Sequence, residues 1–192
     1  MNIRPYVPQD RDAVRAICKA NAVKRYAKSE ARKEEICFLF LDYFLDFEPE
    51  HTFVAVTEEG EVAGYICGSF NYRLYQEKMH RIYDKKIKQV SLLHHLFSKA
   101  VTFSAKRLSK RYGVSMHMNV APSYQHQRVG IRLLDSLKED CRSFGAKGLF
   151  LVTRNRNTTG YPFYLHNGFQ EGRDFLFGSL ALVYPLADKG SE

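Results

Sequence analysis

The stretch Tyr124-Gln-His-Gln-Arg-Val-Gly-Ile-Arg-Leu-Leu134 decides the fold that this sequence predicts. It joins a strand-like run, Val114 to Ala121, to a segment whose apolar residues recur at helical spacing. Those apolar positions are Gly130, Leu134, Leu137, Cys141 and Phe144. The first backbone N–H groups of such a helix have no partner within it, and the helix dipole is positive at that end. The turn therefore predicts an anion site of the kind that holds a polyphosphate.

The residues of the turn fit this interpretation without proving it. Gln127 and Arg128 lie in the turn, and Gly130 would let a ligand approach the backbone closely. Any strand–helix junction offers free N–H donors, however, so an ordinary helix N-terminus remains an equal alternative on spacing alone.

Two later segments complete a pattern. A second apolar strand, Leu149 to Thr153, is followed by Asn157-Thr-Thr-Gly-Tyr-Pro-Phe-Tyr-Leu-His-Asn-Gly-Phe169. This order resembles the GNAT superfamily of acyl-CoA-dependent N-acyltransferases. Gln125 to Gly130 occupies the place of the family's pyrophosphate loop, Gln/Arg-x-x-Gly-x-Gly/Ala. The positions that match the family's second signature are Asn157, Phe163, Tyr164, Gly168 and Phe169.

The chain departs from the family pattern at two positions. Arg128 stands where the loop has glycine, and Pro162 lies inside the expected last helix. Arg128 fits if its side chain points outward or contacts phosphate. Pro162 fits if the helix begins there, because its missing N–H would have no helical partner in a first turn.

The resemblance implies an α/β (α+β) GNAT fold, with a mixed central sheet and flanking helices, and acetyl-CoA as cosubstrate. It implies that the backbone of Met118, Asn119 and Val120 pairs with the pantetheine arm, as a strand edge pairs with an extended ligand. It implies a general-acid role for Tyr164, although a single tyrosine is more often a core residue with a satisfied hydroxyl. Asn157 is expected to cap a helix and to contact the cofactor. The expected cofactor-binding turn comprises Gln125, His126, Gln127, Arg128, Val129 and Gly130.

The remaining pattern predicts one domain over residues 1–192. We expect a first strand at Asn2 to Arg4, a helix capped by Asp10, and one helix from Ser29 to Pro49. Thr52 to Phe70 predicts a β-hairpin that turns at Glu59-Gly60. A last strand is expected from Phe175 to Tyr184, and Gly113 and Gly168 are placed to end helices.

A basic helical insert is expected at about residues 71–112, between the third and fourth strands. It holds eleven Lys and Arg against two acidic residues, in a chain whose formal net charge is +8. Its apolar stripe, which includes Leu93, Phe97 and Val101, must dock on the domain or on a second copy in a homodimer. We expect it to cover the acceptor side of the cleft, with its Lys and Arg at the rim. The insert, with Asp42-Tyr43 and Phe47 to Glu50, resembles bacterial relatives of the acetyltransferase-like domain of O-GlcNAc hydrolases.

The amino-acid composition indicates the class of protein and its expected location. Hydrophobic residues make up 45% of the chain and aromatic residues 14%, which is typical of a packed domain. No run is long enough to span a membrane, and we expect that residues 1–5 are not part of a signal peptide. The four cysteines form no CxxC pair, so we expect buried thiols and a cytoplasmic location. We expect no metal site, because His94 and His95 are adjacent and would point apart on a helix. The basic charge is best explained as a solvated helix face, and no nucleic-acid partner is expected.

The sequence thus predicts an N-acetyltransferase that moves an acetyl group from acetyl-CoA to a primary amine of a small molecule or peptide. The general base stays open. His117 is more often a packed residue, Asn119 cannot accept a proton, and Glu48 and Glu50 are expected to be solvated. A weakly active or inactive CoA-binding module is therefore a rival interpretation, and attachment to nucleic acid or an acidic membrane through the insert is a third.

Overall fold

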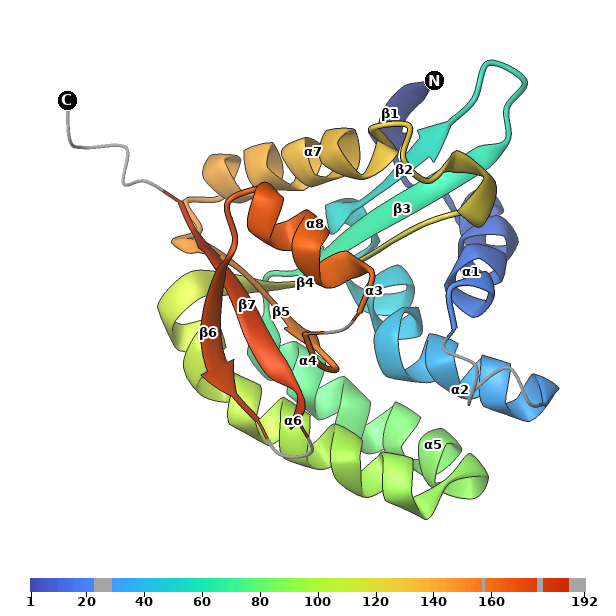
Figure 1. Ribbon diagram of the computed structural model, residues 1–192. Coiled ribbons are helices and arrows are strands. Elements are labelled where there is room, and N and C mark those ends of the chain that lie inside the picture. Colours follow the sequence, from blue (N-terminus) through green and yellow to red (C-terminus); the bar gives the residue numbers. More distant parts are fainter. Residues whose placement is uncertain (23–28, 157, 176–177, 187–192) are drawn as a thin grey trace, which may run out of the picture.

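The computed structural model of the protein describes residues 1–22, 29–156, 158–175 and 178–186, and its core is one seven-stranded sheet (Figure 1). The strands are β1 (Asn2–Pro5), β2 (Thr52–Val56), β3 (Val62–Ser69), β4 (Gly113–Val120), β5 (Gly148–Thr153), β6 (Gln170–Asp174) and β7 (Leu180–Pro185). Their order in the sheet is β1-β2-β3-β4-β5-β7-β6. All neighbouring pairs are antiparallel except β4 and β5, which are parallel. The mixed sheet predicted from the sequence is confirmed.

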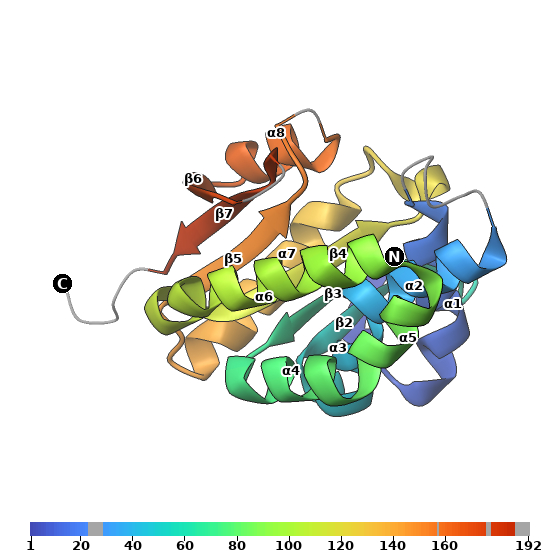
Figure 2. The same cartoon turned by 90° about the horizontal axis from the view of Figure 1, so that it is seen from below.

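Helices cover both faces of this sheet (Figures 1 and 2). One face carries α7 (Val129–Ser143) and α8 (Gly160–His166), which pack on side chains such as Val114 and Met116 of β4. The other face carries the earlier helices. These are α1 (Arg11–Ala20), α2 (Glu30–Phe40), α3 (Asp42–Phe47), α4 (Tyr72–Lys78), α5 (Asp84–Val90) and α6 (Leu92–Tyr112). Because successive strand residues point to opposite faces, each strand contributes to both cores.

The helices from β3 to β4 form the insert. A π-helical turn, η3 (Met79–Tyr83), links α4 to α5, and Ser91 caps α6 by accepting a hydrogen bond from the His94 N–H. Gly113 ends α6 at a φ of +96°, in the left-handed region that favours glycine, as the sequence predicts. Figure 2 shows α6 crossing beneath the sheet in front of β5 and β4. There Ala105 and Leu108 pack with Phe150 of β5.

Three expectations about the elements are wrong. The single helix expected from Ser29 to Pro49 is two helices, broken at Leu41 (φ −130°, ψ −54°), although Ser29 does cap α2. The carboxylate of Asp10 does not cap α1, because it accepts two hydrogen bonds from the Arg4 guanidinium and one from the Val7 N–H. The strand expected at 175–184 is β7, shorter at its start, and the preceding antiparallel strand β6 was not predicted.

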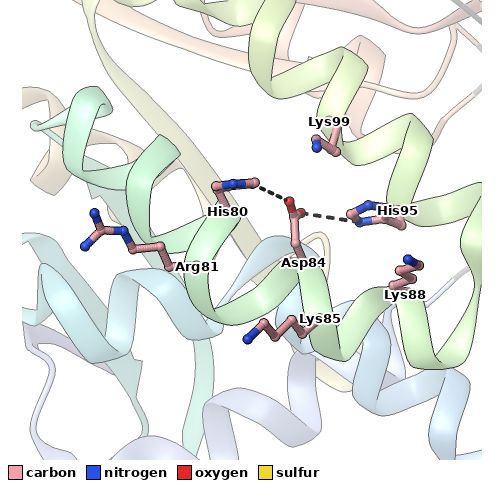
Figure 3. Close-up of a pocket in the computed structure, with 7 residues that line it drawn as sticks. All are labelled: His80, Arg81, Asp84, Lys85, Lys88, His95 and Lys99. Atoms are coloured by element: carbon pink, nitrogen blue, oxygen red, sulfur yellow. Dashed lines mark hydrogen bonds and ion pairs between the residues drawn. The ribbon is translucent and has the colours of Figure 1, made fainter.

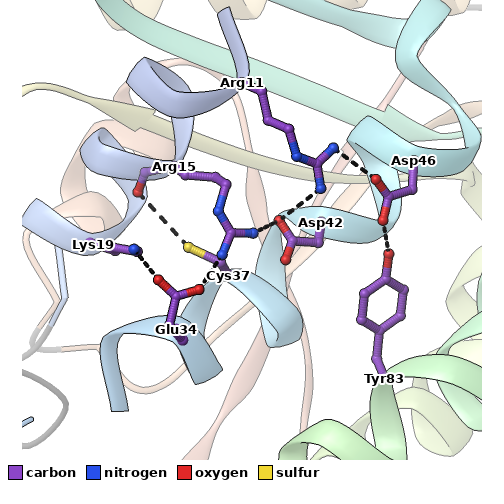
Figure 4. Close-up of polar contacts among 8 residues, drawn as sticks. All are labelled: Arg11, Arg15, Lys19, Glu34, Cys37, Asp42, Asp46 and Tyr83. Carbon is purple, nitrogen blue, oxygen red and sulfur yellow. Dashed lines mark hydrogen bonds and ion pairs between the residues drawn. The ribbon is translucent and has the colours of Figure 1, made fainter. Parts of the chain in front are cut away.

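A chain of ion pairs ties the first three helices together and reaches the insert (Figure 4). Arg15 of α1 lies between Glu34 of α2 and Asp42 of α3 and pairs with both carboxylates. Arg11 Nη1 lies 2.7 Å from Asp46 Oδ1 on α3, and the other oxygen of Asp46 accepts a hydrogen bond from Tyr83 of η3. The insert is therefore bound to the N-terminal helices by a polar contact as well as by its apolar face.

Two further expectations concern the cysteines and possible membrane-spanning helices. All four cysteines are free and buried, as the sequence predicts. Within the described residues, none of the helices combines the length and the hydropathy needed to cross a bilayer.

Candidate functional site

Two neighbouring strands diverge in the middle of the sheet. β4 pairs with β3 from Ser115 to Val120, but its parallel ladder with β5 ends at Ser115 and Phe150. Beyond that point β4 continues to Val120 and β5 to Thr153 without pairing to each other. The two strands thus form a fork whose arms expose backbone groups toward the gap.

The hydrogen-bond pattern of β4 shows which groups face the fork. The Ala121 N–H donates to the Ala63 carbonyl at 2.8 Å, and Val120 lies opposite Gly64. Because residues of an antiparallel pair alternate between bonding to the partner strand and pointing away from it, Met118 and Val120 direct their N–H and C=O groups toward β5. The Val120 carbonyl already accepts from Asn21 Nδ2 at 3.0 Å. This leaves the Met118 and Val120 N–H groups as donors for a ligand in the fork.

The turn after β4 leads into the N-terminus of α7. His126 (φ +64°) and Arg128 (φ +63°) both have left-handed backbone conformations on either side of Gln127. Left-handed residues in a turn point successive N–H groups into a shared concavity that suits an anion. Arg128 is exposed and directly precedes α7, whose first N–H groups have no helical partner. The departure from glycine at this position is therefore accommodated as a left-handed arginine.

The other residues of the turn make hydrogen bonds or packing contacts within the protein. Gln125 Nε2 donates to Asn21 Oδ1 at 3.1 Å, and Gln127 Nε2 donates to the Ser123 carbonyl at 3.0 Å. The Val129 side chain is buried in the core under the sheet, so only its backbone is available to a ligand. Gly130 allows α7 and α8 to pack closely, because a Cβ there would lie 3.1 Å from the Phe163 ring of α8. Its expected role in close ligand approach stays a prediction.

Tyr164 of α8 lies on the same face of the sheet as α7. Its ring is buried between Phe163 and Phe169, with ring centroids 5.3 and 5.2 Å away. Within the described part of the chain its hydroxyl has no hydrogen-bond partner. Burial raises the pKa of Tyr164 well above its ordinary value, so the phenol keeps its proton at neutral pH. Asn157, the other expected contact from this region, lies outside the described residues.

The fork, the turn and the order of elements agree with one family. The sequence matches the acetyltransferase (GNAT) family over residues 19–169. This chain belongs to the GNAT family. Members of the GNAT family use acetyl-CoA. No curated protein sequence matches the chain significantly.

Solved structures share this GNAT fold at low sequence identity. One is described as the crystal structure of SsHAT, with a TM-score of 0.80, 19% identity, and 97% of this chain and 98% of that chain covered. Naa20 from Chaetomium thermophilum, solved with a bisubstrate analogue, has a TM-score of 0.58 at 18% identity, with 97% and 87% covered. A putative phosphinothricin N-acetyltransferase has a TM-score of 0.60 at 15% identity, with 97% and 99% covered. At these identities the comparison shows the fold alone.

A polar cluster lies on β4 of this GNAT chain, on the face opposite α7. Asn119 Nδ2 donates to the Tyr65 hydroxyl at 2.9 Å, and His117 Nε2 lies 3.1 Å from both the Asn119 amide and the Tyr65 hydroxyl. Burial lowers the pKa of His117 to about 4, so the imidazole is neutral near pH 7. Tyr65 and Asn21 were not identified from the sequence. Their contacts with Asn119 and Val120 come from strand pairing and from the end of α1, which no local motif signals.

The acidic candidates for a general base have structural contacts or lie in solvent. Glu48 was expected to be solvated and is instead buried. Its Oε1 accepts from the Phe70 and Asn71 N–H groups at 2.8 and 2.9 Å, and its Oε2 accepts from the Tyr43 hydroxyl at 2.6 Å. Glu48 therefore holds the start of the insert against α3. Glu50 is exposed.

Four of the eleven Lys and Arg side chains of the insert line a separate pocket of about 390 Å³ (Figure 3). At its centre the Asp84 carboxylate lies between His80, whose Nδ1 is 3.2 Å away, and His95, whose Nδ1 is 3.5 Å away. The other lining residues are Arg81, Lys85, Lys88 and Lys99. All of these come from η3, α5 and α6, and none from β4 or β5. The expectation that this charge rims the fork is not met by these residues. Among the described residues, no group of three or more His, Cys, Asp or Glu is arranged to hold a metal ion.

Proposed function

We propose that this GNAT protein transfers the acetyl group of acetyl-CoA to a primary amine by direct attack in a ternary complex. The observation that carries the proposal is the fork at β4 and β5, where the N–H groups of Met118 and Val120, which neither neighbouring strand pairs among the described residues, precede the left-handed turn at His126 and Arg128. An extended ligand with amide groups and a pyrophosphate at one end fits a strand edge that leads to an anion-binding turn.

The residues would act as follows. The turn from Gln125 to Gly130 holds the pyrophosphate, and the backbone of Met118 to Val120 pairs with the pantetheine amides. An N–H of Met118 or Val120 polarises the thioester carbonyl. The amine nitrogen forms a bond to the acetyl carbon while the carbon–sulfur bond breaks. Tyr164, which keeps its proton at neutral pH, gives that proton to the departing thiolate and regains one from the water that takes up the proton of the amine.

The proton of the amine leaves through water in this proposal. Among the described residues, neither His117 nor Glu48 suits a strong base in the fork. The His117 pKa of about 4 makes it a weak acceptor, and Glu48 is occupied by three hydrogen bonds. We therefore expect activity to rise with pH toward the pKa of the acceptor amine.

Because neither His117 nor Glu48 suits a strong base, a second candidate is also supported, a GNAT-fold module that binds acetyl-CoA without turnover. Both candidates predict that acetyl-CoA raises the melting temperature, because a ligand at 100 times its Kd adds about 2.7 kcal/mol to stability. They differ in thiol release, which should depend on added amine only in an enzyme. Measuring free CoA across a panel of primary amines at pH 7 to 9.5 separates them. No melting shift at saturating acetyl-CoA would contradict both.

A further inference from the structure

A cavity of about 110 Å³ lies at the closed end of the fork, on the face of the sheet opposite α7. β4 contributes Ser115, Met116 and His117, and β5 contributes Phe150, Leu151 and Val152, which are the residues at and just beyond the point where the strands separate. Helices of the other face close the cavity. Their lining residues are Leu39, Phe40, Phe44, Tyr72, Tyr75, Phe97, Ser98, Val101, Thr102 and Ala105.

The lining has no charged side chain near pH 7. It includes no Lys, Arg, Asp or Glu, and its one titratable imidazole, His117, is neutral near pH 7 because burial lowers its pKa to about 4. One hydroxyl on the β4 side of the cavity is available to a ligand. Within the described residues, the buried Ser115 Oγ has no hydrogen-bond partner. A cavity lined by aliphatic and aromatic side chains and by neutral hydroxyls favours an uncharged group, since a charge placed there would lose its hydration without finding a counter-ion.

The cavity is reached from the side of α2 and α6. Phe40, which stacks on His117 with ring centroids 5.7 Å apart, is 39% exposed. Along one face of α6, Leu93 is 68% exposed, Phe97 and Val101 are half-buried cavity residues, and Ala105 is buried. The apolar surface thus continues from solvent into the cavity. An occupant can enter from this side, opposite the α7 turn that we assign to acetyl-CoA.

We propose that this cavity selects the acceptor, and that the acceptor is a primary amine carrying a neutral, apolar group the size of a branched alkyl chain or a phenyl ring. The assignment rests on the proposed acetyl transfer. The size follows from the volume of about 110 Å³, which is somewhat below the about 150 Å³ of an apolar protein cavity that binds benzene, and from the open side at Phe40, where a larger group can extend outward. Polyamines, aminoglycosides and lysine peptides carry further charges or long polar chains, which this lining does not match.

The test compares acceptors and two variants of one residue. For the wild-type protein, kcat/KM should be at least about 10-fold higher for phenylethylamine than for ethanolamine or spermidine, since a hydrophobic pocket distinguishes ligands by about 10- to 200-fold per methylene. Val101→Phe, which fills the cavity, should remove this preference. Val101→Glu supplies the missing carboxylate and should shift the preference toward a diamine such as cadaverine. Leu96→Phe, on the same helix but outside the cavity, is the matched control and should keep the wild-type preference.

Three results would overturn the assignment. The first is equal kcat/KM for phenylethylamine and ethanolamine in the wild-type protein. The second is a Val101→Phe variant with unchanged acceptor preference. The third is a Val101→Phe variant that loses activity with butyryl-CoA but not with acetyl-CoA at one acceptor, which would mean that the cavity holds an acyl chain.

Failure of the proposed reaction can be recognised separately. Thiol release would then be absent with every amine, while binding of phenylethylamine can still be measured by isothermal titration calorimetry. Binding to the wild-type protein that is weakened at least 10-fold by Val101→Phe would support the cavity assignment without turnover. No binding to the wild-type protein would contradict it.

Discussion

Phe163 of α8 packs its ring against Gly130 of α7 so closely that a Cβ on Gly130 would lie 3.1 Å from a ring carbon. The two residues come from the two motifs that resemble the GNAT pattern, and the contact joins the turn expected to bind pyrophosphate to the helix that carries Tyr164. We therefore expect stability and site geometry to depend on this pair together.

A double-mutant cycle tests the pair. Gly130→Ala should destabilise the protein by about 1–3 kcal/mol, because the added methyl overpacks against Phe163. In a Phe163→Leu background the same change should be neutral or stabilising by up to about 1 kcal/mol, because alanine is the better helix former. Urea unfolding of the four proteins gives the coupling energy. A Gly130→Ala effect that is the same in both backgrounds would show that the contact with Phe163 does not cause the loss of stability.

Arg128 places a positive charge at the turn, but its left-handed backbone conformation is strained for a residue other than glycine. Arg128→Gly should raise the stability of the ligand-free protein by up to about 1 kcal/mol, because a left-handed conformation costs an L-residue about 1–2 kcal/mol and glycine loses more entropy on folding. The same variant should reduce the melting shift caused by acetyl-CoA. His126→Gly, at an equally left-handed position, is the control that relieves strain without removing this arginine. A full acetyl-CoA shift in Arg128→Gly would place the phosphates elsewhere.

Tyr164 is expected to act in chemistry and not in binding. Tyr164→Phe should lower kcat by roughly 10²–10⁴ with little change in the acetyl-CoA melting shift, because the ring stays packed between Phe163 and Phe169. Tyr161→Phe on the same helix removes a hydroxyl that bonds to Glu171 at the surface, and it should keep full activity. Full activity in Tyr164→Phe would make Tyr164 a core residue only.

His117 links stability to pH. Burial lowers its folded pKa to about 4, below the ordinary histidine pKa of about 6.5, so the unfolded chain binds the proton more tightly. The stabilising contribution is therefore complete above about pH 6.5 and is lost as the pH falls toward 4. Urea midpoints at pH 7.5, 5.5 and 4.5 should fall more steeply for the wild-type protein than for His117→Gln. His166→Gln, at an exposed position of α8, should follow the wild-type curve. Parallel curves for the wild type and His117→Gln would contradict the buried, neutral imidazole.

Most elements could be predicted from local pattern. The hairpin from Thr52 to Phe70 was recognisable because two runs rich in β-branched and aromatic residues flank Glu59-Gly60, and α7 because its apolar residues recur at helical spacing. The break at Leu41 could not be predicted this way. The apolar pattern runs through it without interruption, and only the packing of α2 and α3 as separate helices decides where the chain turns.

The sequence by itself determined most of the strands and helices and the position of the turn between β4 and α7, because periodicity and turn chemistry act over a few residues. Only the tertiary structure decided the environment of each site residue. Glu48 became a buried acceptor and His117 a neutral imidazole beside Tyr65, and four basic side chains of residues 71–112 came to line a pocket away from the fork. Burial and partners arise where distant segments pack together, and the free energy of an ionisable group depends on both.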